Sequence, residues 1–203
     1  MKRRNKIITV AIDSPAAAGA GTQAKLISKH YNLFYLDTGK IYRYIGKLKL
    51  DDKKNFTYSL VNKEISNLKM NQLNNKALLS NEVAVSASKI AKIKKIRNIV
   101  HKYQKKCAYN PPKKYKGSVL DGRDIITVQV KDAMFKFYIS ASLKVRAKRR
   151  YKEYKDLNRK ITYKEVLKSL RIRDKSDKER KFGPLKKTKD SILINTTKLS
   201  KKS

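Results

Sequence analysis

The fold is decided by residues 7–22, which read I-I-T-V-A-I-D-S-P-A-A-A-G-A-G-T. The first six of them form a continuous apolar run rich in β-branched side chains, which is typical of a strand buried on both faces of a parallel sheet. Small residues follow from Asp13 to Gly21, and residues 22–30 have the pattern of a helix. This order of strand, small-residue loop and helix predicts an α/β fold that begins with a buried strand.

The loop of residues 14–22 lies where a phosphate-binding loop, or P-loop, is expected. A P-loop surrounds phosphates with backbone N–H groups at a helix N-terminus, adds a lysine at the terminal phosphates and offers Mg²⁺ a Ser or Thr hydroxyl. Here Ser14 stands at the position of the first glycine and Ala20 at the position of the lysine. The positions that fit are Gly19, Gly21 and Thr22. By themselves these residues leave an ordinary strand-to-helix connection as the alternative.

Further strands and helices follow from the apolar patterns downstream. We expect strands over 33–36, 118–120, 133–140 and 192–194, and helices over 38–48, 88–107, 142–157 and 162–171. Residues 51–82 are polar and only weakly periodic, which indicates an inserted small subdomain whose fold the pattern does not resolve. The alternation predicts a doubly wound parallel sheet that binds its ligands at the carboxyl ends of the strands.

The chain is strongly basic, with 52 Lys and Arg against 16 Asp and Glu and a formal net charge of +36. Such a charge favours nucleic acid or another polyanion as a partner. The alternative is a compositional bias, because 40 of the 52 cations are lysines scattered along the whole sequence. Bias is the better explanation, so we regard a nucleic-acid partner as possible and secondary.

Two simpler features of the sequence bear on membrane association and on the compartment. No apolar run approaches the roughly 20 residues that a bilayer span needs, so no membrane association is expected. Cys107 is the single cysteine and cannot form an internal disulfide, which is typical of a reducing compartment. We therefore expect a cytoplasmic protein, and we expect it to be a monomer.

Several segments beyond the loop occur in the order and spacing found in bacterial cytidylate kinases. They are Tyr35-Leu36-Asp37-Thr38-Gly39 with Tyr42-Arg43, Leu120-Asp121-Gly122-Arg123-Asp124, Arg146-Ala147-Lys148-Arg149-Arg150-Tyr151, and Arg173-Asp174 with Asp177, Arg180 and Gly183-Pro184-Leu185. With the loop included, the chain resembles this family of P-loop nucleoside monophosphate kinases along nearly its whole length.

The resemblance implies a P-loop NTPase fold with three layers and a five-stranded parallel sheet. It further implies one kinase domain over 1–203, with a core of about 1–48, 88–150 and 178–203. A monophosphate-binding insert would span about 49–87, and a lid about 151–177. The implied reaction moves the γ-phosphoryl group of ATP to CMP or dCMP with Mg²⁺, so the partners would be small nucleotides.

Site residues follow from the resemblance position by position. The ATP phosphate loop would comprise Ser14, Pro15, Ala16, Ala17, Ala18, Gly19, Ala20, Gly21 and Thr22. The monophosphate site would comprise Thr38, Arg43, Ser88, Arg97, Arg123, Asp124, Arg173, Asp177 and Arg180. Catalytic arginines would be Arg123, Arg149, Arg150 and Arg173, and Mg²⁺ would be held at Thr22 and Asp121.

The chemistry of these residues agrees with the implied roles. Phosphoryl transfer depends mainly on in-line positioning and on cancelling charge on the phosphate oxygens, for which arginine is well suited. Arg43 and Arg97 could each hold the acceptor phosphate. Asp124 with Arg123 offers an acceptor and donors that complement the amine and ring acceptors of cytosine. Asp177 with Arg173 and Arg180 could do similar work on the base or the sugar.

The chain departs from the family at a few positions, of which Ala20 matters most. Losing one preorganised charge-stabilising donor typically costs about 10² to 10³ in rate. Ser14 and Ala17 replace glycines that permit positive φ, Ile126 replaces a usual glycine, and Leu79 replaces an arginine of the insert. One hypothesis is a working kinase in which a cation such as Lys25, Lys40 or a lysine of the lid replaces the missing ammonium. The other is a catalytically impaired relative that binds nucleotide or RNA through its basic surface.

Overall fold

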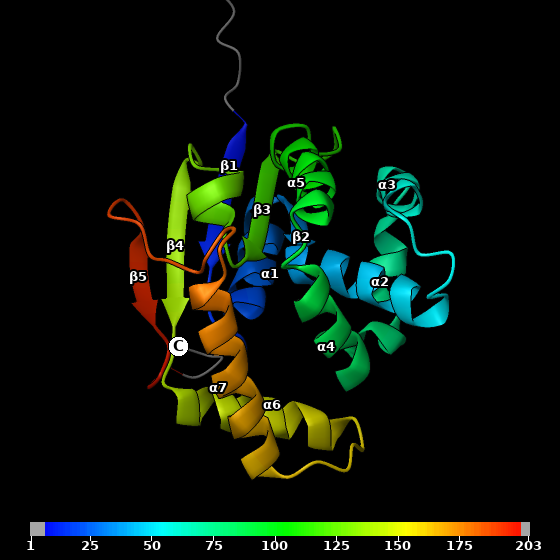
Figure 1. Ribbon diagram of the computed structural model, residues 1–203. Coiled ribbons are helices and arrows are strands. Elements are labelled where there is room, and N and C mark those ends of the chain that lie inside the picture. The colour runs from blue at the N-terminus through cyan, green and yellow to red at the C-terminus, as the bar shows by residue number, and fades with distance from the viewer. Residues whose placement is uncertain (1–6, 200–203) are drawn as a thin grey trace, which may run out of the picture.

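The computed structural model describes residues 7–199. Five parallel strands form one sheet in this part of the chain, in the order β2-β3-β1-β4-β5 (Figure 1). They are β1 (Ile8–Asp13), β2 (Phe34–Asp37), β3 (Gly117–Gly122), β4 (Phe135–Ser140) and β5 (Ile192–Asn195). The predicted five-stranded parallel sheet is confirmed.

The register brings the carboxyl ends of three neighbouring strands to one edge. Asp37 at the end of β2 lies opposite Asp121 of β3, and Asp13 at the end of β1 lies opposite Gly122. Three acidic side chains from distant parts of the sequence therefore gather at one edge, where parallel sheets bind their ligands.

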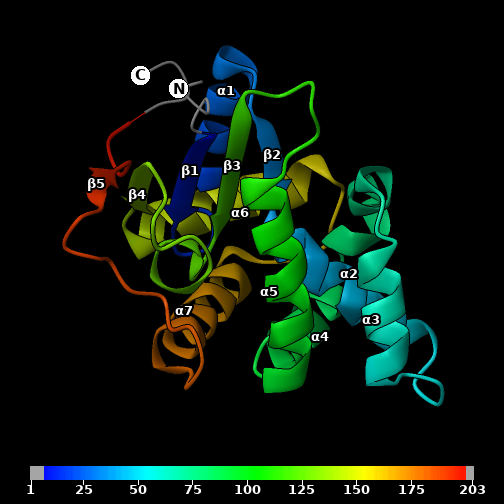
Figure 2. The ribbon, with the colours of Figure 1, turned by 90° about the horizontal axis from the view of Figure 1, so that it is seen from above.

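Helices cover both faces of the sheet, as Figures 1 and 2 show. On one face Val10 and Ile12 pack with Ala24 of α1 (Ala20–Tyr31). On the other face Ala11 packs in the same cluster as Val100 of α5 (Lys94–Tyr109) and the buried side chains of α2 (Thr38–Asp51). Each fully buried Val, Leu or Ile contributes roughly 1.5–3 kcal/mol. The side chains of β1 thus point alternately to the two faces of the sheet, and the helices on both faces give the expected three layers.

The polar stretch 51–82 folds into short helices that stand beside α2. They are α3 (Tyr58–Ser66), the 3-10 helices η1 (Met70–Asn74) and η2 (Lys76–Leu79), and α4 (Asn81–Ile90). Gly46 of α2 permits the close approach of α4, because a Cβ at this position would lie 2.9 Å from the backbone nitrogen of Ala87. Ser86 reinforces this crossing by donating to the Gly46 carbonyl at 3.0 Å.

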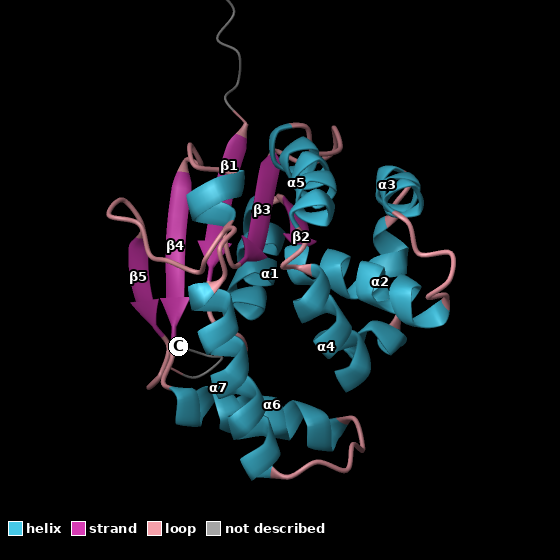
Figure 3. Cartoon of the chain, in the orientation of Figure 1, coloured by secondary structure: helices cyan, strands magenta, loops and turns pink. Residues whose placement is uncertain are grey.

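The single helix expected over 88–107 is wrong, because the chain turns at residues 91–93 between α4 and α5 (Figure 3). The apolar stripe itself is confirmed, since Ile90, Ile96 and Val100 are all buried. The turn is held by Arg97, whose Nη1 donates to the Ala91 carbonyl at 3.1 Å.

Two helices that contact each other, α6 (Leu143–Asp156) and α7 (Tyr163–Glu179), form a helical hairpin, in which α7 crosses α6 below the sheet in the view of Figure 1. The sequence predicted both, but α7 runs eight residues beyond the expected end at Arg171. The expected borders of insert and lid fall inside α2, α4, α6 and α7, and this division of the chain stays a prediction. Within residues 7–199, no helix is both long enough and apolar enough to cross a bilayer.

Candidate functional site

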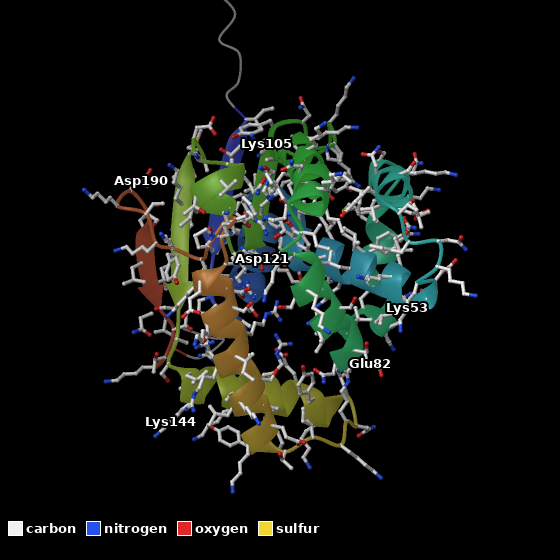
Figure 4. All side chains as sticks on the ribbon, in the orientation of Figure 1. Lys53, Glu82, Lys105, Asp121, Lys144 and Asp190 are labelled. Carbon is white, nitrogen blue, oxygen red and sulfur yellow. The ribbon has the colours of Figure 1, made fainter. Side chains whose placement is uncertain are left out.

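A cavity of about 330 Å³ opens at the carboxyl ends of β1, β2 and β3. Its floor is the loop 14–22, and its walls come from α2, α4, α6, α7 and the end of β3. Figure 4 shows Asp121 near the centre of the molecule, whereas Lys53 and Lys144 extend outward from its periphery. Charged side chains are thus divided between an outer shell of lysines and an inner, mixed group.

The backbone of the loop 14–22 has a conformation that suits the binding of an anion. Gly19 precedes α1 with a φ of 96°, and no side chain caps the first N–H groups of the helix. Such a helix N-terminus binds phosphate through its free N–H groups and its dipole. Two side chains hold the loop in place: Arg146 Nη1 donates to the Ala16 carbonyl at 3.2 Å, and Thr196 Oγ1 donates to the Ala18 carbonyl at 2.8 Å.

Of the nine predicted loop residues, eight line the cavity and Ala16 does not. Ala16 instead packs with Ala147 and Leu170 of the α6–α7 hairpin. Ala20, at the lysine position, lines the cavity with a methyl group. Lys25 and Lys40, the two cations suggested as replacements, line it as well. Lys40 Nζ is also 3.4 Å from Asn74 Oδ1.

Five arginines line the cavity. Arg180 forms an ion pair with Asp124, and the other four, Arg43, Arg123, Arg150 and Arg173, converge on the cavity from different parts of the fold. Burial and then the positive charge of nearby Arg123 together lower the pKa of Arg173 to about 10. The pKa of Arg43 is also lowered, first by burial and then by Arg150. Guanidinium groups that repel one another in this way form a site that gains stability when it takes a polyanion.

The carboxylates beside these arginines pair differently from the sequence prediction. Asp124 pairs with Arg97 and Arg180, whereas Arg123 Nε donates to Asp177 Oδ2 at 3.0 Å. Arg123 and Asp124 both line the cavity, and their joint contact with a cytosine base stays a prediction. Arg173 Nε and Arg180 Nη1 lie 3.7 Å and 3.8 Å from Asp177, so these three residues are grouped as expected, and their contact with the base or the sugar stays a prediction.

Sequence comparison explains this combination of loop and arginines. A model of the cytidylate kinase family matches residues 10–203. The chain belongs to the cytidylate kinase family.

Individual relatives agree with this assignment. The chain is 44% identical to a cytidylate kinase of Bartonella henselae, and the match covers 96% of this chain and 89% of the relative. It is 40% identical to a cytidylate kinase of Thermosipho melanesiensis, with 94% and 90% covered, and 40% identical to one of Fusobacterium nucleatum, with 95% and 91% covered.

A solved structure shares the fold. It is a crystal structure of an uncharacterized protein from Eubacterium ventriosum, with a TM-score of 0.52 and 16% sequence identity. The likeness covers 96% of this chain and 91% of the other. It supports the architecture alone.

Besides Ala16, two predicted site residues of this cytidylate kinase family member lie away from the cavity wall. Arg97 is only 2% exposed and is held by Asp124 and the Ala91 carbonyl, so it does not reach the cavity in this arrangement. Arg149 Nη2 donates to the backbone carbonyls of Thr196 and Leu199 at 2.7 Å and 3.1 Å. Its contact with phosphates stays a prediction. The other predicted monophosphate and catalytic residues all line the cavity.

Thr22 and Asp121, the predicted metal ligands, lie on the same cavity wall. Asp121 Oδ1 accepts a hydrogen bond from the Tyr35 hydroxyl at 3.2 Å, whereas Oδ2 accepts none within the described residues. Burial raises the pKa of Asp121, and the charge of Asp37 raises it further. A free carboxylate oxygen beside a hydroxyl fits Mg²⁺, which uses one or two protein oxygens and completes its shell with phosphate and water. Across residues 7–199, no group of three or more His, Cys, Asp or Glu side chains could hold a metal.

Sequence reasoning missed several residues that shape the site. Asp13 accepts hydrogen bonds from the backbone N–H groups of Ile125 and Ile126, and burial raises its pKa to about 7. His101 and Gln129 both face Asp124. No sequence signal marks these three as site residues, because their roles depend on contacts between segments that are far apart along the chain.

Proposed function

We propose that the protein transfers the γ-phosphoryl group of ATP to CMP or dCMP, giving ADP and CDP or dCDP. Membership of the cytidylate kinase family supports this reaction. The observation that carries it in the structure is one cavity in which the loop 14–22 faces the four converging arginines. Such an arrangement offers separate places for a donor phosphate chain and an acceptor phosphate.

On the donor side, we propose that the N–H groups of residues 14–22 bind the ATP phosphates. Thr22 and Asp121 would hold Mg²⁺, which when bound neutralises charge on the phosphate oxygens. Arg150 stands on α6 within reach of the same cavity, where it would stabilise charge that develops during transfer. The protein supplies positions and charges, and the transfer requires no covalent intermediate on the chain.

On the acceptor side, we propose that Arg43, Arg123 and Arg173 bind the monophosphate. Each of them lines the cavity, and planar guanidinium groups hold phosphate through two parallel hydrogen bonds. Asp124 and Arg180 would read the base. A carboxylate beside a guanidinium matches the N4 amine and the adjacent ring acceptor of cytosine, whereas uracil presents the opposite order.

The absence of a lysine at position 20 is best reconciled with activity through Lys25 or Lys40. Both side chains line the cavity, so either ammonium could approach the terminal phosphates without a change of fold. The alternative is a catalytically impaired protein that retains nucleotide binding. The converging arginines favour the active kinase, because a protein that had lost turnover would not need a separate acceptor-phosphate site.

Turnover of purified protein with ATP, Mg²⁺ and a panel of CMP, dCMP and UMP tests the proposed reaction. Coupled detection of ADP should show CMP or dCMP as the preferred acceptor. If no monophosphate is phosphorylated while ATP still binds, the impaired relative replaces the kinase as the function.

The variants Lys25→Met, Lys40→Met and Ala20→Lys test the replacement of the missing ammonium. We expect one of the two methionine variants to lower kcat by about 10²-fold and Ala20→Lys to restore that variant. Lys29→Met is the matched control, since Lys29 lies on the same helix as Lys25 and outside the cavity wall. The idea is contradicted if wild-type protein makes no CDP and Ala20→Lys alone does.

The remaining expectations concern the protein's surroundings. A cytoplasmic location, a monomeric state and the secondary status of nucleic-acid binding stay predictions.

A further inference from the structure

The two oxygens of Asp124 have unequal surroundings. Oδ2 accepts hydrogen bonds from Arg97 Nη2 and, at 3.1 Å, from Gln129 Nε2, and it lies 3.6 Å from His101 Nε2. Oδ1 accepts no hydrogen bond from the described residues, and its ion-pair partner is Arg180 Nη2 at 3.6 Å. One oxygen is therefore occupied by the protein, and the other remains available to a ligand in the cavity that Asp124 lines.

The nitrogens of Arg180 also have unequal surroundings. Its Nε donates to the Gly183 carbonyl at 2.6 Å, whereas its Nη2 is buried and makes no hydrogen bond with any described residue. A buried donor without a partner carries a desolvation cost that a bound acceptor would remove. Asp124 Oδ1 and Arg180 Nη2 thus lie side by side at 3.6 Å, and neither makes a hydrogen bond with the described residues.

Gln129 is held in position by the turn to which it belongs. It ends the turn η3 (Ile125–Gln129), is 1% exposed, and follows two residues whose N–H groups bind Asp13. The buried Asp13 at the end of β1 therefore fixes the turn that presents the Gln129 amide to Asp124. This connects the central strand of the sheet to the orientation of a cavity carboxylate.

His101 reaches the same oxygen from α5. Burial lowers its pKa to about 4, so the imidazole is uncharged at neutral pH despite the nearby carboxylate. The ring therefore fills the space behind Oδ2 without adding a second positive charge to that of Arg97. Arg97, Gln129 and His101 thus lie around Oδ2, and Arg97 carries the one positive charge among these three.

We propose that Gln129, assisted by His101, is a positioning residue for base selection: it fixes Oδ2 of Asp124 so that Oδ1 alone faces the ligand. This inference rests on the proposed function, in which Asp124 and Arg180 read a pyrimidine. With Oδ1 fixed beside Arg180 Nη2, a base must present a donor next to an acceptor, as cytosine does. Uracil would place its O4 acceptor against the carboxylate.

The variant Gln129→Met tests the inference, because methionine keeps the length of the side chain and removes the amide donor. Full-length protein is titrated with CMP, with UMP and with the monophosphate of 2-pyrimidinone riboside, which lacks the exocyclic amine. Loss of a hydrogen bond to a charged group should weaken CMP binding about tenfold. Binding of UMP and of the amine-free analogue should stay as in wild type, so the CMP-to-UMP affinity ratio falls by the same factor.

Gln104→Met is the matched control, since Gln104 is 1% exposed, lies on α5 and has no recorded hydrogen bond to Asp124 in residues 7–199. Thermal unfolding shows whether each variant is folded. If Gln129→Met does not fold, His101→Phe carries the same titrations, because the partly exposed His101 tolerates a change of ring and should reduce the ratio in the same direction.

The results separate the inference from the function on which it rests. An unchanged CMP-to-UMP ratio in a folded Gln129→Met protein, or an equal loss for all three monophosphates, overturns the positioning role and leaves the base site standing. A wild-type protein that binds CMP and UMP equally overturns the base site and the inference with it. Phosphoryl transfer is judged separately by turnover.

Discussion

Ala17 carries a backbone strain that the sequence comparison with a glycine-containing loop predicts. Its φ is +61°, in the left-handed region that glycine enters freely and that costs other residues roughly 1–2 kcal/mol. The same expectation for Ser14 is wrong, because Ser14 is not among the described non-glycine residues with positive φ. The loop therefore keeps its shape at Ala17 in spite of the Cβ.

Replacing Ala17 with glycine should stabilise the protein by about 0.5–1 kcal/mol. Glycine removes the strain of a positive φ. It also raises the conformational entropy of the unfolded chain, which offsets part of the stabilisation. The measurement is the midpoint of urea unfolding at constant m-value. Ala18→Gly is the control, because Ala18 is buried with no positive φ and its replacement should destabilise. A midpoint that falls for Ala17→Gly would show that the loop is not strained there.

Arginine and aspartate residues illustrate how far the sequence could predict the site. Asp124, Asp177 and the arginines Arg123, Arg173 and Arg180, which the motif positions selected, all line the cavity. The motif positions did not identify which carboxylate binds which guanidinium, because Arg97 and Arg123 reach their partners across segments of unrelated sequence. Pairing depends on tertiary geometry, and a linear pattern contains only the identities of the residues.

At the scale of elements, the turn between α4 and α5 is another feature that could not be predicted from the sequence. Residues 88–96 contain neither glycine nor proline, and the apolar stripe continues in phase through Ile93. Local propensity therefore predicts one helix. The turn forms because Arg97 binds both the Ala91 carbonyl and Asp124, which are contacts made only in the folded protein.

Arg146 of α6 links the α6–α7 hairpin to the loop. It makes two hydrogen bonds with Asp174 of α7, at 3.0 Å and 2.5 Å, and one with the Ala16 carbonyl of the loop. The Arg146 side chain is 6% exposed and that of Asp174 is 16% exposed. A displacement of the hairpin would consequently disturb its contact with the loop 14–22.

Asp174→Asn should lower the free energy of unfolding by about 3 kcal/mol, because it leaves a nearly buried guanidinium without its counter-charge. Asp190→Asn is the matched control, since Asp190 pairs with Lys136 at the surface and should cost less than about 1 kcal/mol. Urea unfolding of both variants gives the comparison. Equal losses would mean that the Arg146–Asp174 pair contributes no more than a surface pair does.

At the scale of the whole molecule, the sheet order is the feature that the sequence could not supply. Each strand was expected from its own apolar run, and the parallel direction follows from the helices between the strands. The placement of β1 between β3 and β4 depends on which pairs bury the central strand best. That choice involves segments more than 100 residues apart.

The net charge is a second property of the whole molecule, and it affects the free energy of unfolding. A net charge of +36 opposes compaction, whereas most of the lysines make no ion pair with the described residues. Raising NaCl from about 0.02 to 0.3 M shortens the Debye length from roughly 20 Å to below 10 Å, so repulsion between distant lysines is screened.

The free energy of unfolding should therefore rise by on the order of 1 kcal/mol across this range of salt, measured by urea unfolding in chloride. Sulfate is unsuitable because it would bind the arginine cluster and stabilise by ligation. The double variant Lys53→Gln with Lys144→Gln, at two outward-pointing side chains, should show a smaller rise. A protein held together mainly by its surface ion pairs would instead lose stability with salt, and that outcome would contradict the role assigned here to unscreened lysine repulsion.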